Sequence, residues 1–308
     1  LIQLLGQEGN YLIQLSGSWC HNSRAMSPYV NAYAKEYGID TIYSYDFNVD
    51  NGDDGSMFVR MSNEKTTLGT KYNYMYGEFV SRYLTNLDDW IAYPSDHDTA
   101  LSYTNAEGKE VTVGRLQQPI IFLYNKDNQT DYSGKGNTSG KCPIMYAFEE
   151  MVDRDSKGLY VKETDDEGNP VLDKEGNQVR KYVTDEYTAR LKQMFEFIKT
   201  NNIQFSKYTK ETYIRDTFNS YGTEVFGSDE QINIYPITYR QLEWLLDEKG
   251  NSLVLIGGSG NEKTRAIIGQ INQYAVKNNV RVYMYDPQID GGITVDKWGY
   301  TQTTSICE

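Results

Sequence analysis

The chain contains an internal repeat, in which residues 1–50 match residues 242–290 once one residue is deleted before the last strand of the second copy. Identical residues recur at matching positions throughout, among them Leu12/Leu253, Gly17/Gly258, Ser18/Ser259, Arg24/Arg265, Asn31/Asn272, Tyr33/Tyr274 and Tyr45/Tyr285. Self-similarity on this scale indicates a duplicated structural unit. We therefore expect two related units in the 308 residues, which agrees with about 150 residues per domain.

Each copy has the pattern of a strand–helix–strand unit. Short apolar runs, Leu12 to Leu15 and Leu253 to Ile256, predict a buried parallel strand, and a Gly/Ser turn follows each run. In the first copy the next segment carries apolar residues on one helical face, namely Met26, Val30, Tyr33 and Tyr37. Thr41 to Tyr45 then predicts the second strand, so each copy is expected to form a right-handed βαβ crossover.

The segments between the copies predict insertions and a closing helix. We expect an aromatic helix at 71–92, a hairpin at 101–113, a strand at 119–124, a helix-like run at 144–152, a hairpin excursion at 159–183 and an amphipathic helix at 186–199. The predicted organisation is a first domain over 1–200, with insertions at about 52–117 and 134–185, a linker over 201–235 and a second unit over 236–308. Residues 291–308 are too few to complete the second copy, so we expect this degenerate unit either to be truncated or to be a partial domain.

Charge limits the partners that this chain can have. The net charge is −13, and no Lys/Arg cluster is present that could neutralise phosphates, so nucleic-acid binding is not expected. An anionic membrane surface is disfavoured for the same reason. No apolar run approaches the roughly 18 residues of a membrane span, so we expect membrane association only through a tether that this sequence does not contain.

Metal and cofactor chemistry is not expected from the residue types. The chain has three cysteines and two histidines, and it has no CxxC pair that could hold zinc. The acidic turn Asp50 to Gly55 superficially looks like a calcium loop. An EF-hand needs Asp or Asn at its third position and an acid at its twelfth, and these positions hold Gly52 and Met61 here. We therefore predict neither a metal nor a cofactor.

The region around Trp19-Cys20 resembles the thioredoxin family. A buried strand runs into a Trp-Cys turn at the start of a helix, Pro28 lies where that family has its helix-kinking proline, and Pro119 opens a later apolar strand as the family's cis-proline does. The resemblance covers Tyr11 to Tyr45 and Gln118 to Tyr124. It implies an α/β, three-layer thioredoxin-like fold with inserted helices and hairpins, plus a second, incomplete thioredoxin-like βαβ unit.

Three departures from the family pattern limit the chemistry that the resemblance implies. The usual CxxC is Cys20-His21-Asn22-Ser23 here, so Ser23 replaces the resolving cysteine and leaves a monothiol site. The buried acid that thioredoxins carry six residues before the first cysteine is replaced by Gln14, which cannot titrate. The second copy has Gly260 to Thr264 at the motif and no thiol, so redox chemistry is not expected there.

Cys20 is the candidate nucleophile. A helix N-terminus stabilises a thiolate through its dipole and free N–H groups. We expect Cys20, Ser23, Trp19 and Pro119 to form the site, with His21 and Gln118 as auxiliary residues. The alternative is a residual cysteine in a fold retained for packing or binding. Cys142 is either a distant resolving thiol or a free loop cysteine, and Cys307 carries no information.

Two functions follow from these alternatives. The first is an extracytoplasmic bacterial thioredoxin-fold protein with monothiol thiol–disulfide exchange through Cys20, acting on a protein thiol or disulfide or on a glutathione-like small thiol. The second is a redox-inactive binding or scaffold protein that uses tandem folds and the Tyr-rich insertion from Tyr72 to Trp90. Exchange requires a Cys20 that solvent can reach, at a helix N-terminus and against a cis Pro119. Binding requires an exposed aromatic patch.

Overall fold

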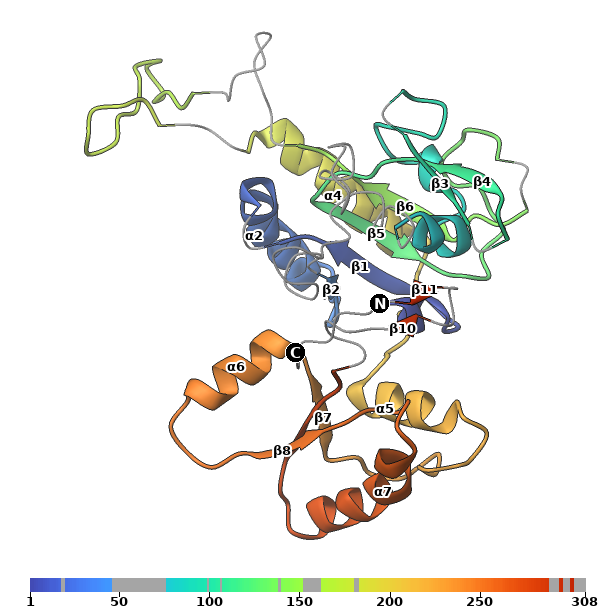
Figure 1. Ribbon diagram of the computed structural model, residues 1–308. Coiled ribbons are helices and arrows are strands. Elements are labelled where there is room, and N and C mark those ends of the chain that lie inside the picture. The colour runs from blue at the N-terminus through green and yellow to red at the C-terminus, as the bar shows by residue number, and fades with distance from the viewer. Residues whose placement is uncertain are drawn as a thin grey trace. The chain divides into compact units, whose positions relative to one another are not determined.

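The computed structural model describes residues 1–17, 20–45, 76–98, 100–105, 107–137, 140–151, 162–179 and 183–287, together with the short strands β10 (Thr294–Val295) and β11 (Tyr300–Thr301). The chain is a mixed α/β protein that divides into two compact units (Figure 1). The first unit is built from Leu1–Phe47, Phe58–Asn105 and Glu110–Ser206, and the second mainly from Lys207–Glu308. Each unit is described by itself below.

The first unit is organised around a four-stranded mixed sheet. Its strands are β1 (Tyr11–Leu15), β2 (Tyr43–Tyr45), β5 (Ile120–Tyr124) and β6 (Ile144–Phe148), in the order β2-β1-β5-β6. β1 and β2 are parallel, whereas β5 runs antiparallel to both β1 and β6. The expected strand–helix–strand crossover is confirmed, because α2 (His21–Glu36) connects β1 to β2.

Helices cover one face of this sheet. α2 and α4 (Asp185–Thr200) pack against it through a core that includes Leu12, Val30, Leu123, Tyr187 and Phe195. The side chains of Ile13 and Phe122 are also fully buried. Because neighbouring strand residues point to opposite faces, the other face of the sheet is covered too. Figure 1 shows the insertion that contains β3 (Leu101–Thr104) and β4 (Glu110–Val113) away from α2, across the sheet.

The first unit confirms several local predictions and corrects one. β3 and β4 form the expected antiparallel hairpin, and residues 76–83 are helical within the predicted aromatic helix, which is followed by the short 3₁₀ helix η2 (Leu87–Asp89). The predicted helix-like run at 144–152 is wrong, because Ile144–Phe148 is the strand β6. Four of the five residues of β6 are buried, so the run lacks the alternation of apolar and polar residues that identifies a strand in a sequence.

The excursion between β6 and α4 consists of two tight turns. Its described residues, 162–179, contain antiparallel bridges from Thr164 to Pro170 and from Leu172 to Gln178. The backbone N–H of Val171 donates to the carbonyl of Glu163, that of Val179 to Val171, and that of Glu163 to Val179. The predicted hairpin excursion is therefore confirmed over these residues.

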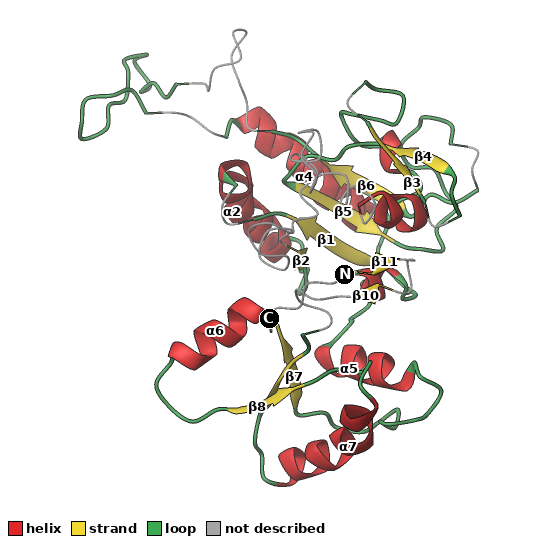
Figure 2. Ribbon diagram, viewed as in Figure 1, coloured by secondary structure: helices red, strands yellow, loops and turns green. Residues whose placement is uncertain are grey.

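The second unit has a three-stranded parallel sheet with the order β7-β9-β8. Its strands are β7 (Ile234–Ile237), β8 (Leu253–Ile256) and β9 (Val282–Tyr285), and its helices are α5 (Lys210–Asn219), α6 (Tyr239–Asp247) and α7 (Glu262–Lys277) (Figure 2). The crossover β8–α7–β9 is the one that the repeat predicts. The linker predicted over 201–235 is wrong, because α5 lies within it and its residues Ile214 and Phe218 are fully buried in the core of the second unit.

The start of the first unit also repeats that of the second. The short helix α1 (Ile2–Leu5) precedes β1 as α6 precedes β8. Leu5 of α1 is fully buried, and its carbonyl accepts a hydrogen bond from the hydroxyl of Tyr124 at 3.0 Å. The repeat therefore extends from sequence to the order of the elements.

Candidate thiol site in the first unit

Cys20 is the N-cap residue of α2. After β1 ends at Leu15, the Cys20 N–H donates to the carbonyl of Gly17 at 3.0 Å, and the Cys20 carbonyl accepts the first helical bond from Arg24. Within the described residues the Cys20 side chain makes no capping hydrogen bond. Cys20 therefore lies at the N-terminus of α2, which is the positive end of the helix dipole.

The second copy shows which residue occupies this N-cap position when there is no thiol. Asn261 occupies the place of Cys20, and its side chain accepts from Lys263 N at 2.9 Å and from Thr264 N at 3.1 Å. Asparagine is among the best N-cap residues, and losing such a cap costs about 0.5–2 kcal/mol. Cysteine at the start of α2 is therefore a poorer choice for helix stability than the residue that the repeat uses elsewhere.

Pro119 lies beside Cys20, and the sheet pairing places it there. The Gln118–Pro119 peptide bond is cis. Leu15, the last residue of β1, pairs with Ile120, the first residue of β5, so the residues just outside these two strands come together. The Cys20 Sγ lies 3.6 Å from the carbonyl oxygen of Gln118, to which it donates. The structure thus brings together Cys20, Gln118 and Pro119.

Access to the thiol is narrow. Cys20 is buried, with 7% of the residue exposed, which counts against the solvent-reachable thiol that exchange requires. Trp19, which was expected to be part of the site, lies outside the described residues. His21 is the first residue of α2 and is half-buried.

Ser23 and Asn22 face inwards. The Ser23 Oγ accepts from Gly17 N at 3.3 Å, so this hydroxyl stabilises the turn in front of the helix. Asn22 is fully buried, and its Nδ2 donates to the Met151 Sδ at 3.3 Å. Both polar side chains of the motif therefore hold the helix start in place. The hydrogen bond described for the Ser23 Oγ is to the Gly17 backbone and not to the sulfur.

Gln14 lies where the family carries a buried acid. It is buried in β1, and its Nε2 donates to the hydroxyls of Ser16 at 3.0 Å and Ser27 at 3.4 Å. This arrangement satisfies the amide without a titrating group.

A half-buried carboxyl, that of Glu149, lies just beyond β6, and the sequence did not predict it. The two Glu149 oxygens accept from the backbone N–H of Gln117 and, at 2.8 Å, from that of Ala92. Burial raises the pKa of Glu149 to about 7, although the two hydrogen bonds oppose the shift. Gln117 directly precedes the Gln118–Pro119 bond. Glu149 therefore fixes the segment that faces Cys20, and no local pattern distinguishes it from its neighbour Glu150.

Cys142 is not placed as a reactive thiol. It is 1% exposed, and burial, followed by the charges of Asp131 and Asp89, raises its pKa. Cys20 and Cys142 are the cysteines that fall within the described residues, and both are free thiols. Cys307 lies outside those residues. Cys142 is thus a free cysteine in a loop, one of the two alternatives that the sequence left open, and its burial disfavours a resolving role.

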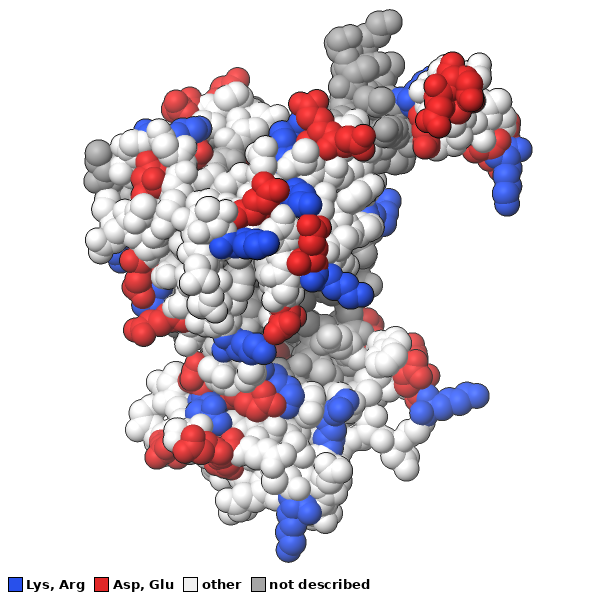
Figure 3. All heavy atoms as spheres, turned by 180° about the vertical axis from the view of Figure 1, so that it is seen from behind, with Lys and Arg blue, Asp and Glu red and all other residues white. Residues whose placement is uncertain are grey.

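The described residues show neither a metal-binding cluster nor a helix that could cross a membrane. No group of three or more His, Cys, Asp or Glu side chains could hold a metal there, and the acidic turn at 50–55 lies outside the described part. None of the described helices combines the length and apolarity that crossing a membrane requires. On the face drawn in Figure 3, acidic and basic side chains are interspersed over the described surface.

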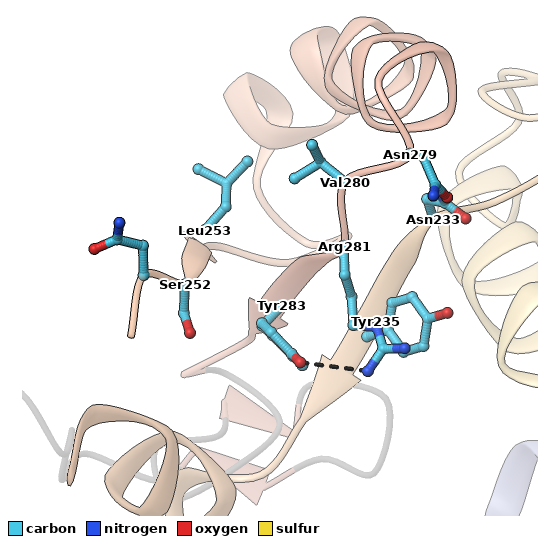
Figure 4. Close-up of a pocket in the computed structure, with 9 residues that line it drawn as sticks. Asn233, Tyr235, Ser252, Leu253, Asn279, Val280, Arg281 and Tyr283 are labelled. Carbon is cyan, nitrogen blue, oxygen red and sulfur yellow. Dashed lines mark hydrogen bonds between the residues drawn. The ribbon is translucent and has the colours of Figure 1, made fainter. Parts of the chain in front are cut away.

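A hollow of about 680 Å³ lies in the second unit, at the amino ends of its strands (Figure 4). The Arg281 guanidinium lies 4.5 Å from the centre of the Tyr235 ring and donates to the Tyr283 hydroxyl at 3.5 Å. Open α/β sheets bind ligands at the carboxyl ends of their strands, so this position does not indicate a site.

Comparisons with family models, with curated proteins and with solved structures find no match to this chain. The functional argument therefore depends on the geometry of the first unit.

Proposed function

We propose that the chain is an extracytoplasmic thioredoxin-like protein whose first unit performs monothiol thiol–disulfide exchange through Cys20. The observation that carries this proposal is the position of the Cys20 sulfur at the start of α2, 3.6 Å from the carbonyl that precedes the cis Pro119. The partner is a protein thiol or disulfide, or a glutathione-like small thiol.

The topology supports the thioredoxin-like part of the proposal. In the first unit a βαβ crossover is followed by two antiparallel strands and a helix, with Pro119 at the start of the strand next to β1. The second unit has the same crossover within a parallel sheet. Fold resemblance gives no activity by itself, so the chemistry has to come from Cys20.

The exchange step is simple in atoms and electrons. Cys20 releases its proton to solvent, and the thiolate attacks one sulfur of the partner's disulfide. The partner's S–S bond breaks, a mixed disulfide with Cys20 forms, and the second partner sulfur leaves as a thiolate. Because Ser23 has no sulfur, the mixed disulfide has to be resolved by an external thiol.

Glutathione disulfide provides the test of this proposal. In a Cys142→Ser, Cys307→Ser background, native protein at pH 7 is expected to form a mixed disulfide between Cys20 and glutathione without unfolding. Intact mass reports the adduct. A thiol that reacts only after unfolding would overturn the proposal and would make Cys20 a structural cysteine.

Restoring the second sulfur gives a further prediction. The variant Ser23→Cys, in the same background, is expected to form an intramolecular disulfide with Cys20 on mild oxidation, which lowers the intact mass by two hydrogens and removes both free thiols. The matched control is Ser27→Cys, one helical turn further along α2. Equal oxidation of the two variants would show that Cys20 does not face the motif.

The binding hypothesis is supported by exposed apolar side chains, although these do not lie in the insertion where they were expected. The described part of the Tyr-rich insertion is packed inward, because Tyr76, Phe79 and Leu84 are each about 1% exposed. That segment does not present an aromatic patch over its described residues. Large exposed apolar side chains occur instead in the second unit, and they carry the next inference.

A further inference from the structure

The second unit exposes apolar side chains at positions that the first unit buries. Leu246, Leu253, Ile256 and Ile267 are exposed by 70%, 47%, 67% and 47%. Their counterparts in the repeat are fully buried, namely Leu5, Leu12, Leu15 and Met26. An apolar residue at the same position of the repeat thus lies in a core in one unit and on the surface in the other.

The first unit shows what covers these positions. There the strand β5 pairs antiparallel with β1 along its whole length, and the apolar residues of β6 and α4 complete the core. In the second unit β8, the counterpart of β1, pairs with β9 on one side, and no described strand pairs with it on the other. β8 is therefore an edge strand with an apolar surface on each side.

The two edge strands of this sheet differ in their protection against pairing with another strand. β7, the opposite edge, contains Pro236, which cannot donate to an added strand. β8 has the sequence Leu-Val-Leu-Ile, without proline or charge. Proteins protect free edges with such features, since an unprotected apolar edge pairs with another chain. Two of the exposed apolar side chains named above, Leu253 and Ile256, lie on this unprotected edge strand.

The exposed surface lies on both faces of the sheet around β8. The crossover β7–α6–β8 passes over β9 in one direction and β8–α7–β9 returns in the other, so right-handed connections place α6 and α7 on opposite faces. Figure 2 shows the two helices on either side of β8. Trp244 and Leu246 of α6 and Ile267 and Tyr274 of α7 are exposed. A groove of about 340 Å³, lined by Leu253, Leu255, Ile271 and Tyr274 among others, opens between β8 and α7.

We propose that β8 of one copy of this chain pairs antiparallel with β8 of a second copy, forming a two-fold symmetric dimer. A two-fold axis makes any edge strand antiparallel to its mate, which is the orientation that β5 has on β1. The same axis brings α6 against α6 on one face and α7 against α7 on the other. A second copy therefore covers both faces at once, and it supplies a strand that is apolar and uncharged, as β5 is.

Sedimentation velocity of the full chain tests this dimer. At micromolar concentration the expected species has twice the 35.4 kDa mass of the chain. Ile256→Lys and Leu253→Lys are each expected to weaken the dimer at least about tenfold, because they bury a charge against its symmetry mate. The matched control is Leu172→Lys, which changes a leucine that is 57% exposed in the first unit and is expected to leave the mass unchanged.

Hydrogen exchange gives a local readout of the same proposal. Backbone amides of β8 are expected to be protected at high protein concentration and to exchange faster on dilution below the dissociation constant. Circular dichroism checks that the lysine variants fold, which exposed positions allow. A monomer throughout, as when a different polypeptide covers β8, would overturn the proposal, and so would a dimer that both lysine variants leave intact.

Discussion

Replacing Phe195 by alanine is expected to lower the free energy of unfolding of the first unit by about 3–5 kcal/mol, the cost typical of a large aromatic removed from a core. Phe195 is fully buried where α4 meets α2. Its ring centre lies 5.6 Å from that of Tyr33 and 6.0 Å from that of Tyr37. Both tyrosines belong to or follow α2, the helix that begins at Cys20, so the cavity lies between the two helices that cover the sheet.

Denaturant unfolding followed by near-ultraviolet circular dichroism measures this loss. The control is Phe197→Ala on the same helix, where the ring is half-buried and contacts Tyr132 and Tyr146 at 5.1 Å between centres. We expect about 1 kcal/mol for the control, since solvent fills the space that the ring leaves. Equal losses for the two variants would show that α4 does not seal the core.

Stability is expected to fall as the pH rises from about 4.5 to about 7, through the contribution of Glu149. Burial raises its folded-state pKa to about 7 from an ordinary value of 4.5. The folded state therefore holds a proton that the unfolded state has released over this window. By linkage the contribution is fully present below the unfolded pKa and is lost by pH 7 or slightly above, a difference of about 3 kcal/mol.

The variant Glu149→Gln isolates this effect, because glutamine cannot titrate. Its stability is expected to lack the decline between pH 4.5 and 7 that the parent protein shows, when both are unfolded in denaturant across that range. Glu196→Gln is the control, since Glu196 is exposed on α4 and should leave the parent's slope unchanged. A parent and a Glu149→Gln variant with the same pH dependence would mean that this carboxyl is solvated in the folded state.

Sequence alone predicted the parts of the fold that local patterns encode. The repeat located both βαβ crossovers, and the apolar period of Glu186 to Lys199 located α4. The proline at 119 correctly opened the strand beside β1. These features succeed because period, turn residues and proline act within a few residues.

The rest depends on contacts between distant segments. Residues 201–235 read as a polar linker, yet Phe218 and Phe226 meet in a core that their own neighbours do not reveal. Glu149 and Glu150 are adjacent and identical, but Glu149 accepts from two backbone N–H groups, whereas Glu150 pairs with Arg190 at 2.6 Å. No local pattern separates them, so the carboxyl nearest to the thiol segment was missed.

The excursion at 162–179 contains the same short turn motif twice. Asp165 and Asp173 each begin a turn that continues to Glu-Gly-Asn, and each carboxylate accepts the backbone N–H of that asparagine, at 2.7 and 2.8 Å. The three backbone hydrogen bonds that join Glu163, Val171 and Val179 close on one another in a ring. The turns of this segment are therefore stabilised by hydrogen bonds within the segment itself. Because these hydrogen bonds lie within the segment, we expect that it can be lengthened, exchanged or tagged with little effect on the stability of the first unit.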